Sequence, residues 1–354
     1  MKTKTRRKIA LVGGARPNFM KIAPIYHVLK EKNMPFFLLN TGQHFDEKMS
    51  KQFFREFKIA PHYNITPSTT TPISQLTSMM LEIEKIFTKE KPAIVVVVGD
   101  VNSTFVAAYV AHKMKIPVAH VEAGLRSRNR EMPEEINRIL VDQISDLLFV
   151  TEKEGIKNLK KENIAGEVHF VGNIMMDTLA LFADSIKPTD NDFYFCTLHR
   201  AENVDHQEIF AEILDALEVI SKDAPIFLPL HPRTAKKAEE FGLMTRLKNI
   251  FRLLEPLAYS EAVYYQKNAK LVLTDSGGIQ EETTFLGTPC ITLRKETERP
   301  ITVHLGTNTI GGVKKSTILK AYRTKDLKKK KVKIQLWDGR TANRIATVLH
   351  KYVK

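Results

Sequence analysis

The run Ile94-Val-Val-Val-Val98 constrains the fold of this chain more than any other stretch. All five residues are β-branched and no polar residue interrupts them, so the run does not alternate between a buried and an exposed face. A strand of this kind is buried on both faces, as in parallel sheets that helices cover on either side. Gly99 and Asp100 follow directly and end the strand. We therefore predict a central strand of an α/β sheet.

Strand-like and helical patterns alternate on both sides of this run. Apolar residues recur at helical spacing between the short apolar runs. Repeated βα alternation favours a doubly wound parallel sheet. The further strands predicted in this half are residues 8–13, 35–39, 118–122 and 147–151, and the helices are 19–32, 45–57, 73–89, 102–115 and 134–146.

A second alternation follows residues 188–192, a polar, turn-rich stretch that we interpret as a hinge. The 354 residues exceed the usual size of one domain, which favours two. We predict an α/β protein with two Rossmann-like doubly wound domains facing a cleft: residues 1–172, residues 173–337, and a C-terminal helix within 338–354 that packs back across them. The strands predicted in the second half are 193–198, 225–230, 271–274 and 290–293.

The composition is that of a globular protein with a strongly basic balance. Hydrophobic residues make up 43% and the net charge is +14. Much of the excess is scattered lysine and the run Lys328-Lys-Lys-Lys331, and no nucleic-acid-binding motif accompanies it. An anionic small substrate or a basic solvated surface explains the charge as well. We expect no nucleic-acid partner.

The cysteines and the N-terminus suggest an intracellular location. Cys196 and Cys290 lie far apart in apolar runs, which predicts buried, unpaired thiols in a reducing compartment. The apolar run near the N-terminus stops at Gly13-Gly-Ala-Arg-Pro17, too short for a signal peptide. No segment is long enough to span a membrane. We expect a cytoplasmic protein without membrane association.

Acidic side chains follow the predicted strands of the first half. Glu122 ends its strand, and ligands of open α/β sheets bind at that edge. Glu134 and Arg138 share one face of the next helix. Glu134 and Glu135 both suit the positive end of a helix. We favour this interaction with the helix dipole as the whole role of Glu135, but not of Glu134. Candidate acids and bases for proton transfer are Asp100, Glu122, Glu134 and His199.

Two of these candidates have other interpretations. Asp100 could cap the following helix, and His199 could donate to a phosphate instead of moving a proton. Metal binding is disfavoured because no Cys/His cluster has ligand spacing and His120 stands alone.

A strand-to-helix turn in the second half, Thr274-Asp-Ser-Gly-Gly-Ile-Gln-Glu-Glu282, suits a nucleotide. Its glycines let backbone N–H groups at the helix N-terminus approach a phosphate, and Ser276 can also donate. Glu282 could accept hydrogen bonds from ribose hydroxyls. The alternative is an ordinary turn capped by Asp275 or Ser276.

The N-terminal turn Gly13-Gly-Ala-Arg-Pro-Asn-Phe-Met-Lys21 is also glycine-rich but has neither the dinucleotide nor the Walker spacing. Arg16 and Lys21 could contact a diphosphate. Lys21 could equally be a solvated helix residue.

A series of motifs, in order, resembles the non-hydrolysing UDP-N-acetylglucosamine 2-epimerases of bacteria and archaea. The resemblance runs from about residue 8 to the C-terminal helix. The motifs are Gly14-Ala-Arg-Pro17, Thr41-Gly-Gln-His44, Gly99-Asp100, His120-Val-Glu-Ala-Gly-Leu-Arg126, Pro133-Glu-Glu-Ile-Asn-Arg138, His199-Arg-Ala-Glu-Asn203, Thr274-Asp-Ser-Gly-Gly-Ile-Gln-Glu-Glu282 and Thr297-Glu-Arg-Pro300.

The resemblance implies a GT-B architecture and reversible conversion of UDP-N-acetylglucosamine (UDP-GlcNAc) to UDP-N-acetylmannosamine (UDP-ManNAc). UDP is eliminated to give a 2-acetamidoglucal and is then added back. It also implies no metal or redox cofactor, a homodimer, and a role in polysaccharide biosynthesis. The catalytic residues implied are Asp100, Glu122, Glu134 and His199, and the substrate-binding residues are Arg16, Lys21, Arg138, His231, Ser276, Gly277, Gly278 and Glu282.

Some positions depart from the commonest family pattern. Ala15 stands where Thr is usual and Asn18 where Glu is usual, so a UDP-2,3-diacetamido uronic acid is an alternative substrate. Many bacterial members bind a second substrate molecule as activator through residues that include Gln43 and His44. Asp46 stands near the place of a further Gln of that set, and no Arg lies between Arg55 and Arg126, which argues against activation. A glycosyltransferase of the same fold and a non-catalytic UDP-sugar binder remain further alternatives.

Overall fold

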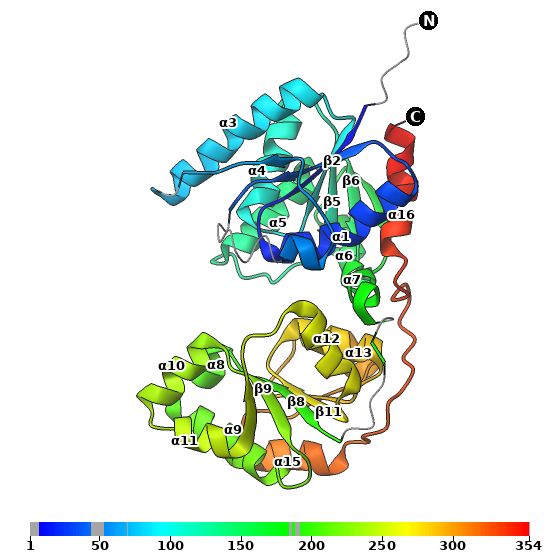
Figure 1. Ribbon diagram of the computed structural model, residues 1–354. Helices are drawn as coiled ribbons and strands as arrows, with labels where there is room; N and C mark the ends of the chain where they lie inside the picture. Colours follow the sequence, from blue (N-terminus) through cyan, green and yellow to red (C-terminus); the bar gives the residue numbers. More distant parts are fainter. Residues whose placement is uncertain (1–6, 44–52, 69, 184–185, 188–191, 354) are drawn as a thin grey trace, which may run out of the picture. The chain divides into compact units, whose positions relative to one another are not determined.

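The computed structural model describes residues 7–43, 53–68, 70–183, 186–187 and 192–353. The chain forms two compact units, which we describe one at a time (Figure 1). The first contains Met1–Thr178 and Gln335–Lys354, and the second contains Leu179–Ile334. The sequence-based division placed its breaks after residues 172 and 337.

The first unit is built on a seven-stranded sheet in which every neighbouring pair is parallel. The order is β3-β2-β1-β4-β5-β6-β7, so the winding reverses between β1 and β4. All five residues of β4 are buried, as the β-branched run predicts. The strands are β1 (Ile9–Gly13), β2 (Phe36–Asn40), β3 (Tyr63–Asn64), β4 (Ile94–Val98), β5 (Val118–Ala123), β6 (Leu147–Val150) and β7 (Glu167–Phe170).

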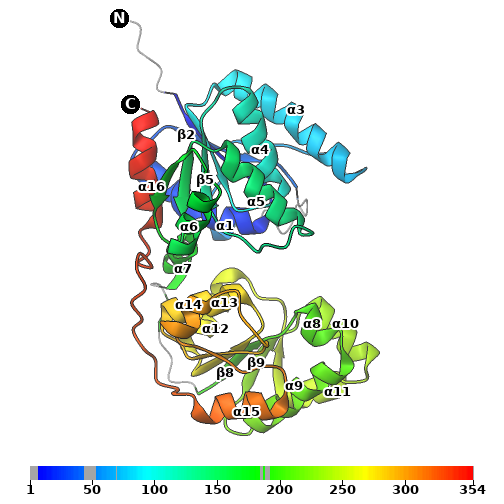
Figure 2. The same ribbon diagram turned by 180° about the vertical axis from the view of Figure 1, so that it is seen from behind.

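Helices connect the strands of this unit, and the chain returns to it at its C-terminal end. The helix α16 (Thr341–Leu349) packs against α1 (Arg16–Glu31), as both views show (Figures 1 and 2). Asp177 accepts hydrogen bonds from the backbone N–H groups of Thr341 and Ala342 at 3.0 and 2.7 Å, which caps the start of α16. The other helices are α3 (Pro72–Glu90), α4 (Asn102–Lys113), α5 (Pro133–Ile144) and α6 (Lys153–Lys161), and η1 (His350–Tyr352) follows α16.

The second unit has a six-stranded parallel sheet of order β10-β9-β8-β11-β12-β13, which reverses between β8 and β11. Its strands are β8 (Tyr194–Thr197), β9 (Ile226–Pro229), β10 (Phe251–Leu254), β11 (Leu271–Thr274), β12 (Cys290–Thr292) and β13 (Asn308–Ile310). Its helices are α8 (Ala201–Val204), α9 (Gln207–Ile220), α10 (Pro232–Glu240), α11 (Met244–Ile250), α12 (Tyr259–Asn268), α13 (Gly277–Leu286), α14 (Pro300–His304) and α15 (Lys315–Thr324), and α7 (Ile174–Ala183) crosses from the first unit into the second.

The prediction of two Rossmann-like doubly wound units is confirmed, whereas the cleft between them stays a prediction. Both cysteines are free and buried. Burial raises the pKa of the Cys290 thiol to about 11, which suits an inert side chain. Within the described residues, no helix is both long and apolar enough to cross a membrane. Parts of the predicted helix 45–57 and the hinge at 188–192, together with His44 and Asp46, lie outside the described residues.

Candidate active site

Each sheet carries polar side chains at the carboxyl ends of the strands where its winding reverses. In the first unit these follow β1, β4 and β5, and in the second they follow β8 and β11. Crevices at such reversal points are where open α/β sheets bind ligands. Each sheet therefore carries its own candidate ligand-binding group, and we describe each within its own unit.

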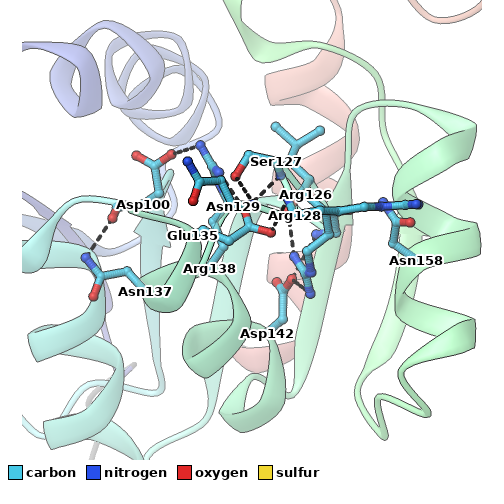
Figure 3. Close-up of polar contacts among 12 residues, drawn as sticks. Asp100, Arg126, Ser127, Arg128, Asn129, Glu135, Asn137, Arg138, Asp142 and Asn158 are labelled. Carbon is cyan, nitrogen blue, oxygen red and sulfur yellow. Dashed lines mark hydrogen bonds and ion pairs between the residues drawn. The ribbon is translucent and has the colours of Figure 1, made fainter. Parts of the chain in front are cut away.

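Asp100 follows β4 after one glycine, Gly99, and is held at two points (Figure 3). A side-chain oxygen of Asp100 lies 2.5 Å from the Arg138 guanidinium, and Asn137 donates to the Asp100 backbone carbonyl at 2.9 Å. The Asp100 side chain keeps 27% of its surface exposed, so the paired carboxylate can still reach a ligand. The N-cap of α4 is Val101, so Asp100 does not cap that helix.

Glu122 lies at the end of β5 and pairs with Lys21 of α1. Their side chains are 13% and 17% exposed, respectively. A β-carbon built onto Gly99 would lie 3.5 Å from a Glu122 carboxylate oxygen and 3.4 Å from the Lys21 ammonium, so all three meet beside the end of β4. Lys21 is thus an ion-pair partner, not a freely solvated helix residue. Asp100 and Glu122 therefore each have a cationic partner.

The two neighbouring acids of α5, Glu134 and Glu135, differ in burial and in their contacts. Glu134 is exposed on the first turn. Glu135 is 1% exposed and accepts hydrogen bonds from the backbone N–H groups of Ser127 and Arg128 at 2.8 and 2.9 Å. It also lies 2.9 Å from Arg138 (Figure 3). Glu135 therefore stabilises the loop before the helix, a more specific role than the dipole contact that the sequence suggested.

Asn18 organises the turn after β1. Its carbonyl oxygen accepts from the N–H groups of Gly14 and Ala15 at 3.3 and 3.2 Å, and its amide donates to Val98 at 2.8 Å. The side chain is 2% exposed. Arg16, at the first position of α1, is exposed, with its guanidinium carbon 5.9 Å from the centre of the Phe53 ring. The predicted diphosphate contact of Arg16 stays a prediction.

Sequence reasoning missed the buried partners of this site. His120 and Asp142 are both fully buried and lie 2.7 Å apart. Asp142 also pairs with Arg126 at 2.7 Å (Figure 3). The one signal was an acid, Asp142, placed one helical turn after Arg138 among apolar residues of α5.

In the second unit, Asp275 after β11 organises the turn after β8. One carboxylate oxygen accepts from the backbone N–H groups of His199 and Arg200, both at 2.8 Å, and the other lies 3.1 Å from the His199 ring. Burial raises the pKa of Asp275, but the hydrogen bond and charge of His199 outweigh it, and the pKa lies below its usual value. Asp275 thus positions His199 instead of capping the helix that follows it.

His231 lies close to His199 and is the N-cap residue of α10. The two ring centres are 5.4 Å apart, and His231 accepts a hydrogen bond from the N–H of Arg233 at 3.2 Å. Burial, followed by the charges of His199 and Arg233, lowers the pKa of His231. A neutral ring of this kind can donate to an anionic ligand from its other nitrogen.

The helix α13 presents an open N-terminus. Ser276 is its N-cap residue but makes no side-chain capping bond. A β-carbon built onto Gly277 would meet nothing within 4 Å, and one built onto Gly278 would meet only the Ser276 hydroxyl at 4.0 Å. The first N–H groups of the helix and the Ser276 hydroxyl are thus placed to receive an anion, as phosphates are received elsewhere.

Glu282 lies deeper in the same helix, with 6% of its surface exposed. Tyr259 donates to one carboxylate oxygen at 2.9 Å and Gln266 to the other at 2.7 Å. Burial raises the pKa of Glu282, and these two hydrogen bonds offset the effect only in part. A ribose hydroxyl would have to share a carboxylate that already has two donors. The predicted ribose contact stays a prediction.

Comparison with known proteins places this arrangement in context. The model of the UDP-N-acetylglucosamine 2-epimerase family matches residues 27–350. A relative from Methanocaldococcus jannaschii named UDP-N-acetylglucosamine 2-epimerase is 41% identical, and the match covers 97% of this chain and 98% of that protein. A Pseudomonas aeruginosa relative named UDP-2,3-diacetamido-2,3-dideoxy-D-glucuronate 2-epimerase is 39% identical, over 97% of this chain and 99% of that protein.

The solved structure of the Methanocaldococcus jannaschii UDP-GlcNAc 2-epimerase in complex with UDP-GlcNAc and UDP is similar throughout. Its sequence identity is 39%, its TM-score is 0.80, and the match covers 97% of this chain and 99% of that one. The similarity includes both units of the fold.

Proposed function

Since this chain belongs to the UDP-N-acetylglucosamine 2-epimerase family, we propose that it is an isomerase that interconverts UDP-GlcNAc and UDP-ManNAc. The observation that carries the proposal is the pair of acids at the ends of β4 and β5. Asp100 follows β4 and Glu122 lies at the end of the adjacent parallel strand β5, and each is paired with a cation. Inversion at C2 requires one group to remove a proton from one face and another group to deliver a different proton to the opposite face.

The reaction runs through elimination and addition. A base takes the C2 proton, the bond between C1 and the UDP oxygen breaks, and 2-acetamidoglucal and UDP remain bound. In the second half the UDP oxygen reattaches to C1 while an acid delivers a proton to the other face of C2. Asp100, Glu122 and Glu134 share the proton transfers, and Arg16, Lys21, Arg138 and His199 stabilise the diphosphate. Cations and helix N-termini can meet the charge of this leaving group.

The second unit holds the nucleotide in this proposal. Ser276, Gly277 and Gly278 receive the diphosphate at the start of α13, which is supported by the absence of a side-chain cap there among the described contacts. His231 donates beside His199, and Glu282 accepts from the ribose. The complex of the Methanocaldococcus jannaschii enzyme with UDP-GlcNAc and UDP supports a nucleotide-sugar site in this family.

A second candidate substrate is a UDP-2,3-diacetamido uronic acid. The Pseudomonas aeruginosa relative that bears this substrate's name is 39% identical, close to the 41% of the UDP-GlcNAc relative. The residues of the turn after β1, including Ala15 and Asn18, depart from the commonest pattern and line the same end of the sheet as Glu122.

Parallel incubations of the purified protein with each nucleotide sugar test the proposal. Proton NMR of the anomeric and C2 signals should show the manno epimer from UDP-GlcNAc, without acceptor or added metal. Turnover of the diacetamido uronate alone would select the second candidate. Transfer to an added acceptor without epimerisation would indicate a glycosyltransferase, and tight UDP binding without turnover of either sugar would indicate a binding protein.

We also propose that the protein is a cytoplasmic homodimer that serves polysaccharide biosynthesis. Light scattering of the purified protein tests the dimer.

A further inference from the structure

The backbone of Glu122 adopts an unusual conformation for a residue with a side chain. Its φ is +71°, in the left-handed region, and the pairing of β5 with β6 shifts register between Val121 and Ala123. Such a conformation is strained for a residue with a side chain and persists where the surrounding contacts enforce it. Contacts around Glu122, one of the proposed catalytic acids, must therefore hold its backbone in this conformation.

The carboxylate of Asp142 contacts the chain both before and after Glu122. One oxygen of Asp142 is 2.7 Å from the His120 ring nitrogen Nδ1, two residues before Glu122. The other oxygen accepts from the backbone N–H of Gly124, two residues after it, at 3.0 Å. Asp142 is fully buried, so no water competes for these contacts. The two contacts fix the span that contains the left-handed residue.

The second ring nitrogen of His120 connects the pair to Asp100. Nε2 lies 2.8 Å from the backbone carbonyl of Gly99, the residue before Asp100. Gly99 itself has a φ of +69°. The buried ring of His120 therefore links the ends of β4 and β5, where Asp100 and Glu122 lie.

The hydrogen-bond partners determine the protonation of this ring. A carbonyl oxygen can only accept, so Nε2 must donate to Gly99. Asp142 accepts from the backbone N–H of Gly124 and lies 2.7 Å from the Arg126 guanidinium, so its carboxylate is an acceptor for Nδ1 as well. Both ring nitrogens therefore face acceptors, one a backbone carbonyl and the other a carboxylate.

Further charged groups surround the His120–Asp142 pair. Arg126 lies 2.7 Å from Asp142 and 2.6 Å from Glu162, and its side chain is 4% exposed. The buried Asp142 carboxylate therefore has a cationic partner, which a buried charge requires. The network joins β5, the loop after it, α5 and the residue that follows α6 in the first unit.

We propose that the Asp142–His120 pair is a positioning device that holds Glu122 and Asp100 in the geometry for proton transfer. Neither residue touches substrate in this proposal. The effect on turnover depends on the proposed epimerase function, whereas the protonation of His120 does not. An ordinary structural ion pair would stabilise the unit without any selective effect on turnover.

The first test requires no substitution. In protein labelled with nitrogen-15 at histidine, the ring of His120 should show two protonated nitrogens at neutral and mildly alkaline pH. Of the described histidines, His120 is the fully buried one, so its ring protons should exchange most slowly with water. A ring with one unprotonated nitrogen at neutral pH would overturn the proposal, whether or not the protein turns over either sugar.

The second test compares Asp142→Asn with the matched control Asp177→Asn. Asp177 is also a buried carboxylate of the first unit with two backbone N–H donors, but it caps α16. Asp142→Asn should reduce kcat about 10²-fold with little change in KM, because the acids are misplaced while binding groups remain. Asp177→Asn should lower Tm and leave kcat unchanged. Equal losses of Tm with unchanged kcat in both variants would contradict the positioning role.

Absence of turnover by the parent protein on both nucleotide sugars would contradict the proposed function. The ring measurement alone would then decide the Asp142–His120 pair. If Asp142→Asn does not fold, Asp142→Glu replaces it: the longer side chain keeps the charge and shifts the contacts, and an unchanged kcat in that folded variant would overturn the proposal.

Discussion

The carboxyl ends of the strands present different groups in the two sheets. In the first unit the acids are already paired: Asp100 with Arg138, and Glu122 with Lys21. In the second unit the start of α13 has no side-chain cap, and space remains around Gly277. Charged groups are oriented by the fold in one unit, and hydrogen-bond donors are left open in the other.

This difference suggests a division of labour. Groups that transfer protons must be held within a narrow geometry before the substrate arrives, since misplacement costs rate. Donors that bind a phosphate gain most when the fold has not already satisfied them. Substitutions in the first unit should therefore alter turnover, and those in the second should alter binding.

The largest effect is expected for Glu122→Gln. The amide keeps the shape but cannot accept or deliver the proton, so kcat should fall about 10³-fold. Isothermal titration should show little change in UDP affinity, because the substitution leaves the residues proposed to bind the nucleotide in place. Glu131→Gln, in the exposed loop before α5, is the matched control and should keep full activity. Substantial remaining activity in Glu122→Gln would favour a transferase.

The two glycine turns should respond differently to the same substitution. A β-carbon on Gly14 would lie 2.0 Å from the Thr41 hydroxyl and 2.1 Å from the Ser103 hydroxyl, whereas one on Gly277 meets open space. Gly14→Ala should therefore lower the free energy of unfolding by about 1–3 kcal/mol, and Gly277→Ala should change it little. Urea unfolding of both variants measures this. Equal destabilisation would contradict the contrast between a filled and an open turn.

Ser276→Ala should weaken UDP binding about tenfold through loss of a hydrogen bond to an anion. Stability should hardly change, because the hydroxyl makes no capping bond. Titration with UDP, together with a thermal unfolding curve, separates the two effects. Unchanged affinity would remove Ser276 from the phosphate site.

The smallest effect concerns Glu282, whose buried carboxyl has a raised pKa and neutral donors. The folded state binds this proton more tightly than the unfolded state does. The contribution of Glu282 to stability is therefore present at low pH and is lost as pH rises from the unfolded pKa through the raised folded pKa. Glu282→Gln should remove this dependence, so the variant should gain stability relative to the parent as pH rises. Urea unfolding at mildly acidic and mildly alkaline pH tests the sign, and a constant difference would contradict it.

The sequence predicted the strands whose own residues form an apolar run. The strands 94–98 and 271–274 begin and end where expected, because a short apolar run defines each of them. The edge strand β7, with the half-exposed sequence Glu167-Val-His-Phe170, was not predicted, since few apolar residues mark it.

The candidate site was predicted in part for the same reason. Strand ends revealed Asp100, Glu122 and the turn at Ser276, which local patterns place. The partners were not visible, because the contacts of Asp142 with His120 and of Asn18 with Val98 join residues far apart in the sequence. Glu135 looked like a simple helix-dipole residue, and only the folded loop shows its two backbone donors.

The most direct test of the central claim is deuterium incorporation at C2 during turnover in heavy water. We predict that the parent protein converts UDP-GlcNAc to UDP-ManNAc carrying deuterium at C2, and that Glu122→Gln incorporates almost none while still binding UDP. Epimerisation that keeps the original C2 proton, or undiminished exchange in Glu122→Gln, would contradict proton transfer by the paired acids of the first unit.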